Sequence, residues 1–202
     1  MLARWLEDAD LFVCTDAAGR PYAELPRKPD LVIGDFDSLG AAAREEGLRF
    51  EHVPDQDSSD AEKALRYLAA AGCQEAALLG ATGRRLDHTL YNVLLLGRFA
   101  RTLRLCLADD QTLSVALLPA ERYRWALPAD TLFSLLPLGA PAAGVTLGGA
   151  KYTIENATIG IAGPSALSNR VASPPLELCF DSGLLVLCVP VAPDRGARRS
   201  EA

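Results

Sequence analysis

Residues 75–108 read EAALLGATGRRLDHTLYNVLLLGRFARTLRLCLA, and this stretch decides the fold class of the N-terminal half. Two short apolar runs, 75–80 and 103–108, enclose a segment at 87–100 with a helical pattern. A strand, a helix and a second strand in this order are typical of a parallel sheet in an α/β layer.

The same alternation continues toward the N-terminus. A second helical segment covers 59–71, and further apolar runs lie at 10–14, 30–34 and 48–53. Near-continuous apolar runs of this length suit strands that are buried on both faces of a parallel sheet. We therefore predict a doubly wound, mostly parallel α/β domain over residues 1–110.

The chain reads differently after Asp109, where the helical pattern stops. Short apolar runs such as TLSVALL, TLFSLLPL and LLVLCV follow, separated by Gly, Pro, Asn and Asp. Many short strands with turn residues between them indicate an antiparallel sandwich or barrel. We predict an all-β domain over 111–192 and a flexible tail over 193–202.

Composition excludes several classes of protein. Half of the residues are apolar and 23% are charged, as in ordinary globular proteins. No run of about 18 uncharged apolar residues exists, so no membrane span is expected. The net charge of −6 argues against a nucleic-acid partner. Five cysteines without a CxxC pair, mostly in apolar runs, indicate reduced thiols in a cytoplasmic protein.

Acidic residues follow the ends of the predicted strands, where open α/β sheets bind ligands. Two carboxylates about 4 Å apart repel by about 4 kcal/mol at an effective dielectric constant of 20, so such a group needs a cation or a shared proton. Oxygen ligands favour Mg²⁺. The segments concerned are Thr15-Asp16, Gly34-Asp35-Phe36-Asp37-Ser38, Asp55-Gln56-Asp57-Ser58-Ser59-Asp60, the loop from Gly80 to His88, and Asp109-Asp110.

Asp35 and Asp37 are two residues apart on an extended segment, so both carboxylates can reach one metal while Phe36 turns into the core. The alternative is a solvated acidic turn. Ser59 and Glu62 match a capping box at the start of the second helical segment, which Gly72 is expected to end.

Lys63 lies one turn into that helix, on the same side as Asp60. It either forms an internal ion pair or reaches a phosphate while Asp57 or Asp60 helps to hold the metal.

The loop Gly80-Ala81-Thr82-Gly83-Arg84-Arg85 precedes a helix that starts near Asp87. Its glycines let the backbone approach a phosphate, and an arginine can bind phosphate oxygens through two parallel hydrogen bonds. Asp87 is alternatively an N-cap. His88 and Asn92 share a helix face and are alternatively structural polar groups.

Taken in order, these motifs resemble the thiamine pyrophosphokinase family. The resemblance covers roughly residues 10–190 and includes segments of the second half. The matching segments are Gly34–Ser38, Asp57–Asp60 with Lys63-Ala64-Leu65, Gly80–Gly83 with Arg85–His88 and Asn92, Ser134–Leu138, Gly149–Tyr152, and Ser168-Asn169.

The resemblance implies an N-terminal α/β domain, a C-terminal β-sandwich that binds thiamine and forms a homodimer, and transfer of the diphosphate of ATP to thiamine. It implies Mg²⁺ as cofactor and ATP and thiamine as substrates. Matching positions assign metal binding to Asp35, Asp37, Asp57 and Asp60, and catalysis to Asp35, Asp37, Asp60, Lys63, Arg85 and Asp87. They assign ATP binding to Asp16, Ser38, Lys63, Gly83, Arg85, His88 and Asn92, and thiamine binding to Tyr152, Ser168 and Asn169. An aromatic ring such as that of Tyr152 suits a cationic thiazolium.

The sequence departs from the family pattern at two loops. Ala17 and Ala18 stand where the family has two glycines, and Arg84 stands where it has one. Three other hypotheses stay open, and the departures motivate the last of them. They are diphosphate transfer to another alcohol such as a hydroxymethylpterin, a nucleotide-sugar transferase that uses the Asp35-Phe36-Asp37 motif, and a thiamine- or nucleotide-binding homologue without activity.

Overall fold

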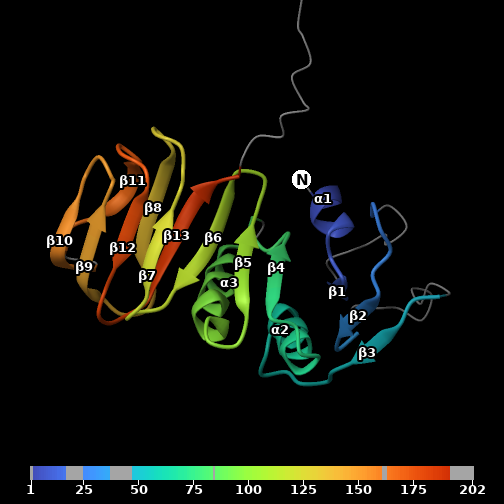
Figure 1. The fold of residues 1–202 in the computed structure, drawn as a ribbon. Helices are drawn as coiled ribbons and strands as arrows, with labels where there is room; N and C mark the ends of the chain where they lie inside the picture. Colours follow the sequence, from blue (N-terminus) through green and yellow to red (C-terminus); the bar gives the residue numbers. More distant parts are fainter. Residues whose placement is uncertain (1, 17–24, 37–46, 84, 161–162, 192–202) are drawn as a thin grey trace, which may run out of the picture.

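The computed structural model describes residues 2–16, 25–36, 47–83, 85–160 and 163–191 of the 202-residue chain (Figure 1). These residues are rich in sheet and contain three helices. The helices are α1 (Leu2–Glu7), α2 (Asp60–Ala70) and α3 (Leu86–Phe99). In the described part of the chain, none of them is long and apolar enough to cross a membrane. The five cysteines are all free.

The first three strands form a parallel sheet in the order β1-β2-β3. They are β1 (Val13–Thr15), β2 (Leu31–Gly34) and β3 (Phe50–His52). Strand β2 is fully buried, as its unbroken apolar sequence predicts. The prediction of a parallel N-terminal sheet is confirmed for these strands.

The next two strands are also parallel to each other, but they belong to a different sheet. Strands β4 (Glu75–Leu79) and β5 (Arg104–Ala108) form one edge of a six-stranded sheet with the order β11-β8-β13-β6-β5-β4. No hydrogen-bonded pairing joins β1 to β4 among the residues described. The expectation of one doubly wound sheet across residues 1–110 is therefore corrected: its strands are divided between two sheets.

A tight turn joins β5 to the antiparallel strands of the second half. The Asp109 carboxylate accepts hydrogen bonds from the backbone N–H groups of Gln111 and Thr112, at 2.9 and 2.8 Å. The turn folds β6 back onto β5 as an antiparallel pair. The six-stranded sheet thus continues across the predicted boundary near residue 110, and the acid after β5 serves this turn.

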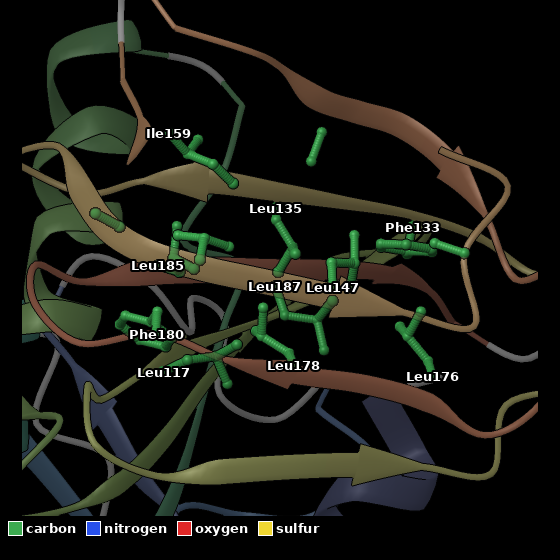
Figure 2. Close-up of a cluster of buried hydrophobic side chains, with 14 of the residues drawn as sticks. Leu117, Phe133, Leu135, Leu147, Ile159, Leu176, Leu178, Phe180, Leu185 and Leu187 are labelled. Atoms are coloured by element: carbon green, nitrogen blue, oxygen red, sulfur yellow. The ribbon is translucent and has the colours of Figure 1, made fainter. Parts of the chain in front are cut away.

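The second half is built from antiparallel strands, as predicted. The bounds are β6 (Thr112–Leu117), β7 (Arg122–Trp125), β8 (Leu132–Pro137), β9 (Ala142–Gly148), β10 (Ile154–Ile159), β11 (Ala166–Arg170), β12 (Leu176–Cys179) and β13 (Leu185–Pro190). A four-stranded sheet, β10-β9-β12-β7, packs on the larger sheet through one apolar core. In Figure 2 the labelled side chains of both layers meet in this core, with Leu135 and Leu187 from one sheet and Leu147 and Leu178 from the other.

The two longer helices lie against the N-terminal strands. Helix α2 contacts β1, β2 and β4, and α3 contacts β5 and β6. Helix α2 begins as predicted, because the Ser59 side chain accepts a hydrogen bond from the Glu62 backbone N–H at 3.3 Å. It ends at Ala70, and Gly72, two residues later, has a φ of +83° that suits glycine and stops the helix as predicted. Helices α2 and α3 also contact each other, and both lie beside β4 and β5 in the middle of the molecule (Figure 1).

Candidate functional site

Lys63 is the centre of the predicted phosphate-binding group. Its side chain is only 2% exposed, although lysine ordinarily reaches solvent. The Nζ atom donates a hydrogen bond to Asp60 Oδ1 at 3.1 Å and lies 3.6 Å from Asp35 Oδ2. Helix α2 and the end of β2 therefore place two carboxylates around one buried cation.

These carboxylates keep the Lys63 ammonium charged. Burial alone would lower the pKa of Lys63, but the hydrogen bond to Asp60 and the negative charges of Asp60 and Asp35 raise the pKa above its ordinary value. Both carboxylates remain partly exposed, Asp35 by 22% and Asp60 by 33%. Lys63 is thus a fixed positive charge at the edge of solvent.

The end of β2 is shaped by a glycine. A Cβ atom on Gly34 would lie 2.8 Å from Cγ of Asp16, so a larger residue has no room there. Asp16 is buried directly after β1, and its backbone N–H donates to the Ile33 carbonyl at 3.1 Å. The structure thus brings the first two acidic segments together at one end of the parallel sheet.

The loop before α2 supplies the next acids. Gln56 Nε2 donates a hydrogen bond to Asp35 Oδ2 at 3.1 Å, which links this loop to the end of β2. Asp55 accepts hydrogen bonds from the Ser58 side chain and the Asp57 backbone, and these bonds lower its pKa. Asp57 itself is exposed and faces the cleft described below.

The start of α3 presents an exposed ion pair. Arg85 donates two hydrogen bonds to Asp87, from Nε at 3.1 Å and from the terminal nitrogen Nη2 at 2.6 Å. The bonds from Arg85 are the largest cause of a lowered Asp87 pKa of about 2, and the same pair raises the pKa of Arg85. The alternative that Asp87 is the N-cap is wrong, because Arg85 occupies the N-cap position and Asp87 lies in the first turn.

Asn92 has a structural partner in the loop that follows β4. Its side-chain amide donates a hydrogen bond to the Ala81 carbonyl at 2.9 Å, and the residue is buried. Thr89 Oγ1 donates to the Gly83 carbonyl at 3.2 Å, and Gly83 has a φ of +93°. Asn92 and Thr89 together fix the loop that carries Gly83, which accords with the structural alternative for Asn92.

A cleft of about 430 Å³ lies between the first turns of α2 and α3. Three of its lining residues were predicted as site residues, namely Asp57, Asp87 and His88. Ser58, Ser59, Gln56 and Tyr91 complete the lining. Residues at the start of α2 form one wall of the cleft, and residues at the start of α3 form the other. Gln56 lines the cleft and is hydrogen-bonded to Asp35, so the cleft lies beside the Lys63 cluster.

Sequence reasoning missed three residues of this region. Gln56 was quoted in its loop without a role, and Glu62 was assigned only to a capping box. The Glu62 side chain instead contacts Arg66 and Arg98 and accepts a hydrogen bond from Tyr91. That hydrogen bond raises the pKa of Tyr91. The position of Tyr91, one residue before Asn92 on a helix predicted to carry site residues, is a weak indication in the sequence that Tyr91 belongs to this region.

The predicted thiamine-binding residues lie together in the sandwich. Asn169 Nδ2 donates to the Tyr152 carbonyl at 2.7 Å, and Asn169 Oδ1 accepts from the Tyr152 N–H at 3.1 Å. Asn169 is buried, so it fixes the backbone of Tyr152, whose side chain is 63% exposed. Lys151 Nζ lies 5.5 Å from the centre of the Tyr152 ring. Ser168 has a φ of +55°, and its N–H donates to Ser134 Oγ at 3.0 Å.

Within one chain this group is remote from the phosphate-binding group. Strand β11, which carries Ser168 and Asn169, is five strand positions from β4 in the same sheet. At about 4.8 Å per position that is about 24 Å, and β1–β3 lie beyond β4 (Figure 1). The structure thus brings together Asp35, Asp60 and Lys63, but within one chain it does not bring the predicted thiamine-binding residues to them.

Several predicted residues fall on parts of the chain that the structure does not describe. They are the metal ligand Asp37, the ATP-binding residue Ser38, and the departures Ala17, Ala18 and Arg84.

Comparison with known proteins agrees with the resemblance. The family model for the thiamin pyrophosphokinase catalytic domain matches residues 2–107, and the model for its vitamin B1 binding domain matches residues 126–185. Thiamine pyrophosphokinase 1 of Oryza sativa subsp. japonica is 30% identical over an alignment of 207 positions, which covers 88% of this chain and 78% of the relative. Thiamine pyrophosphokinase of Bacillus subtilis (strain 168) is 26% identical over 166 residues, which cover 79% of this chain and 77% of that protein.

Solved structures give the same result. The crystal structure of thiamin pyrophosphokinase from Geobacillus thermodenitrificans superimposes with a TM-score of 0.79 at 26% identity, and the match covers 95% of this chain and 92% of that one. The Bacillus subtilis structure has a TM-score of 0.80 at 22% identity, covers 94% and 92%, and supports the fold alone. Because family models match both halves and relatives match most of its length, the chain belongs to the thiamin pyrophosphokinase family.

Proposed function

We propose that this chain transfers the diphosphate of ATP to the hydroxyl of thiamine, releasing AMP and thiamine diphosphate. Its relatives carry the name of this ATP-dependent diphosphotransferase. The observation that carries the proposal within this chain is the buried Lys63 ammonium between Asp35 and Asp60. A charged lysine that is buried at the mouth of an acidic cleft suits an anionic ligand that arrives with a cation.

Several residues of the site are proposed to bind the phosphates of ATP. Lys63 offers a positive charge that does not need to be ordered when ATP arrives, because Asp60 already holds it. Arg85 is exposed and bound to Asp87, so it can exchange that carboxylate for phosphate oxygens with the same two-pronged geometry. His88 and Gly83 complete the phosphate side as proposed ATP contacts, while Asn92 keeps the Gly83 loop in place.

The oxygen donors of the site fit Mg²⁺. Asp35 and Asp60 both approach one cation, the Lys63 ammonium, and Mg²⁺ is usually bound through one or two carboxylates together with substrate phosphates. Among the described residues no set of three metal-ligating side chains is grouped, so phosphate oxygens would complete the shell. Asp57 and Asp37 are the further proposed ligands. When bound, the ion would neutralise the charge that develops on the phosphate oxygens.

The reaction follows from this arrangement. The thiamine hydroxyl attacks the β-phosphorus in line, the bond to the α-phosphate oxygen breaks, and AMP leaves. A carboxylate of the cluster accepts the hydroxyl proton. Transfer of this kind depends on positioning and charge neutralisation more than on covalent catalysis, and Lys63 and Arg85 supply the protein's share.

The separation between the two residue groups supports a homodimer, because a second copy would bring Tyr152 to the phosphate-binding cleft. Exposed leucines mark two surfaces for such contact. Leu86, Leu90 and Leu94 form a stripe along α3 and are at least half exposed, and Leu136 and Leu167 are exposed on β8 and β11. Exposed apolar patches of this kind commonly mark protein interfaces. We propose residues 1–110 as the nucleotide-binding half, residues 111–192 as the thiamine-binding half, and the cytoplasm as the location that suits free cysteines.

A product assay tests this function. Purified protein is mixed with ATP, Mg²⁺ and thiamine, and the expected products are AMP and thiamine diphosphate. A hydroxymethylpterin serves as the control acceptor and should give no product. Asp35→Asn should lower turnover at least 100-fold with the fold retained. Formation of neither product by folded wild-type protein would overturn the proposal, and near-normal turnover of Asp35→Asn would remove Asp35 from the machinery.

A further inference from the structure

Glu62 and Tyr91 form a contact between α2 and α3 that the reaction described above does not use. Tyr91 donates its hydroxyl hydrogen to Glu62 Oε2 at 2.5 Å. The Glu62 side chain is 1% exposed, and a carboxylate this deeply buried is expected to have charged or hydrogen-bonded partners. Here these partners come from both helices.

Two arginines neutralise the buried carboxylate. Glu62 Oε1 lies 2.6 Å from a guanidinium nitrogen of Arg66, one turn further along α2. It lies 3.0 Å from a guanidinium nitrogen of Arg98, near the end of α3. Tyr91 and Arg98 are seven residues apart, which places them on the same face of α3 two turns apart. One carboxylate therefore contacts α3 at two levels and opposes both rotation and sliding of α3 against α2.

This contact lies directly behind the cleft. Tyr91 lines the cleft on the α3 side, and Ser58 and Ser59 line it at the start of α2. Glu62 is one turn after Ser59 and is followed by Lys63, which holds Asp60 and Asp35. Fixing Glu62 to Tyr91 thus sets the distance between the Lys63 side and the Asp87 side of the cleft.

We propose that Glu62 is a positioning residue for nucleotide binding. It holds the Tyr91 hydroxyl and thereby fixes the Tyr91 ring as a rigid wall of the cleft. This inference rests on the proposed function, since it takes the cleft to be the ATP site. It predicts an effect on ATP and none on thiamine, because none of the proposed thiamine contacts (Tyr152, Ser168 and Asn169) lies on α2 or α3.

The test compares two tyrosine-to-phenylalanine variants. Tyr91→Phe keeps the ring and removes only the hydroxyl that Glu62 holds. Tyr123→Phe is the matched control, because the Tyr123 hydroxyl is also hydrogen-bonded, to the Leu118 N–H and carbonyl in the sandwich. Each is assayed for KM of ATP, KM of thiamine and kcat, and ATP affinity is measured independently by calorimetry with Mg²⁺.

We expect Tyr91→Phe to raise KM for ATP and the calorimetric Kd about tenfold, with kcat and KM for thiamine within about twofold. Tyr123→Phe should lower the melting temperature and leave all three constants unchanged. Glu62→Gln should also raise KM for ATP about tenfold, and the double variant should be no worse than either single one, because both act through one contact.

Unchanged ATP affinity in Tyr91→Phe, or an additive double variant, would overturn the positioning role. If the wild-type protein binds ATP but makes no product, the proposed function fails, while calorimetry still decides the role of Tyr91.

Discussion

Removing the Lys63 ammonium is the sharpest perturbation of the site. Lys63→Met keeps the aliphatic stem in its buried position and takes away the charge that Asp60 and Asp35 hold at 3.1 and 3.6 Å. A phosphate oxygen at a similar distance would interact with the ammonium by about 5 kcal/mol at an effective dielectric constant of 20. Part of this is offset, because the ammonium already interacts with two carboxylates in the absence of ATP.

The net effect on turnover should resemble the loss of one preorganised charge-stabilising group, about 2.7–4 kcal/mol, or a 100- to 1000-fold lower kcat. Stability should change little, because burial of the ammonium is itself unfavourable and the two carboxylates left behind are 22% and 33% exposed, so water can solvate them. The assay measures kcat by AMP release and stability by thermal melting. Lys28→Met is the matched control, since Lys28 is exposed, and it should leave both unchanged.

Lys63→Gln, which keeps a hydrogen-bond donor for Asp60, is the second variant to assay if Lys63→Met does not fold. If either folded variant retained more than a tenth of wild-type turnover, Lys63 could not be the positive charge that binds the ATP phosphates.

Three further predictions follow from other contacts. Gly34→Ala should destabilise the fold by about 1–3 kcal/mol in denaturant titration, because its Cβ would meet Asp16 at 2.8 Å; an unchanged midpoint would contradict this. Carboxyl NMR should find the Asp87 pKa near 2, and Arg85→Met should return it toward the ordinary value of about 3.9. Because this folded-state pKa is depressed, the pair's contribution to stability is complete above about pH 4 and is lost as the pH falls through 2. A midpoint unmoved by Arg85→Met would show that the pair is absent in solution. Leu90→Glu should turn the proposed dimer into a monomer by light scattering; a variant that stays dimeric would remove the α3 stripe from the interface.

Features set by neighbouring residues in the chain could be predicted from the sequence. Helix α2 begins at the Ser59 cap and ends at Ala70, just before Gly72, as expected, because capping groups and glycine act within one turn. The pairing of Lys63 with Asp60 was expected for the same reason, since the two are three residues apart on one helix face.

Features set by distant partners could not be predicted. The apolar runs of β4 and β5 indicate buried strands but not which sheet they join, and the Asp109 turn that pairs β5 with β6 reads in the sequence as one more acidic loop. Glu62 fits a capping box in sequence, yet its side chain turns to two arginines and Tyr91 because α3 packs there. Strand β11 has no apolar run to indicate it, because three of the five residues in ALSNR are polar and Ser168 has a positive φ.

The central claim is that the β- and γ-phosphates of ATP move together while the α-phosphate stays with AMP. A single turnover of the wild-type protein with thiamine, Mg²⁺ and ATP labelled at either the α- or the γ-phosphorus tests this directly. We expect γ-label in thiamine diphosphate and α-label in AMP, in equal amounts. Release of the α-label as ADP, with the γ-label in thiamine monophosphate, would contradict it.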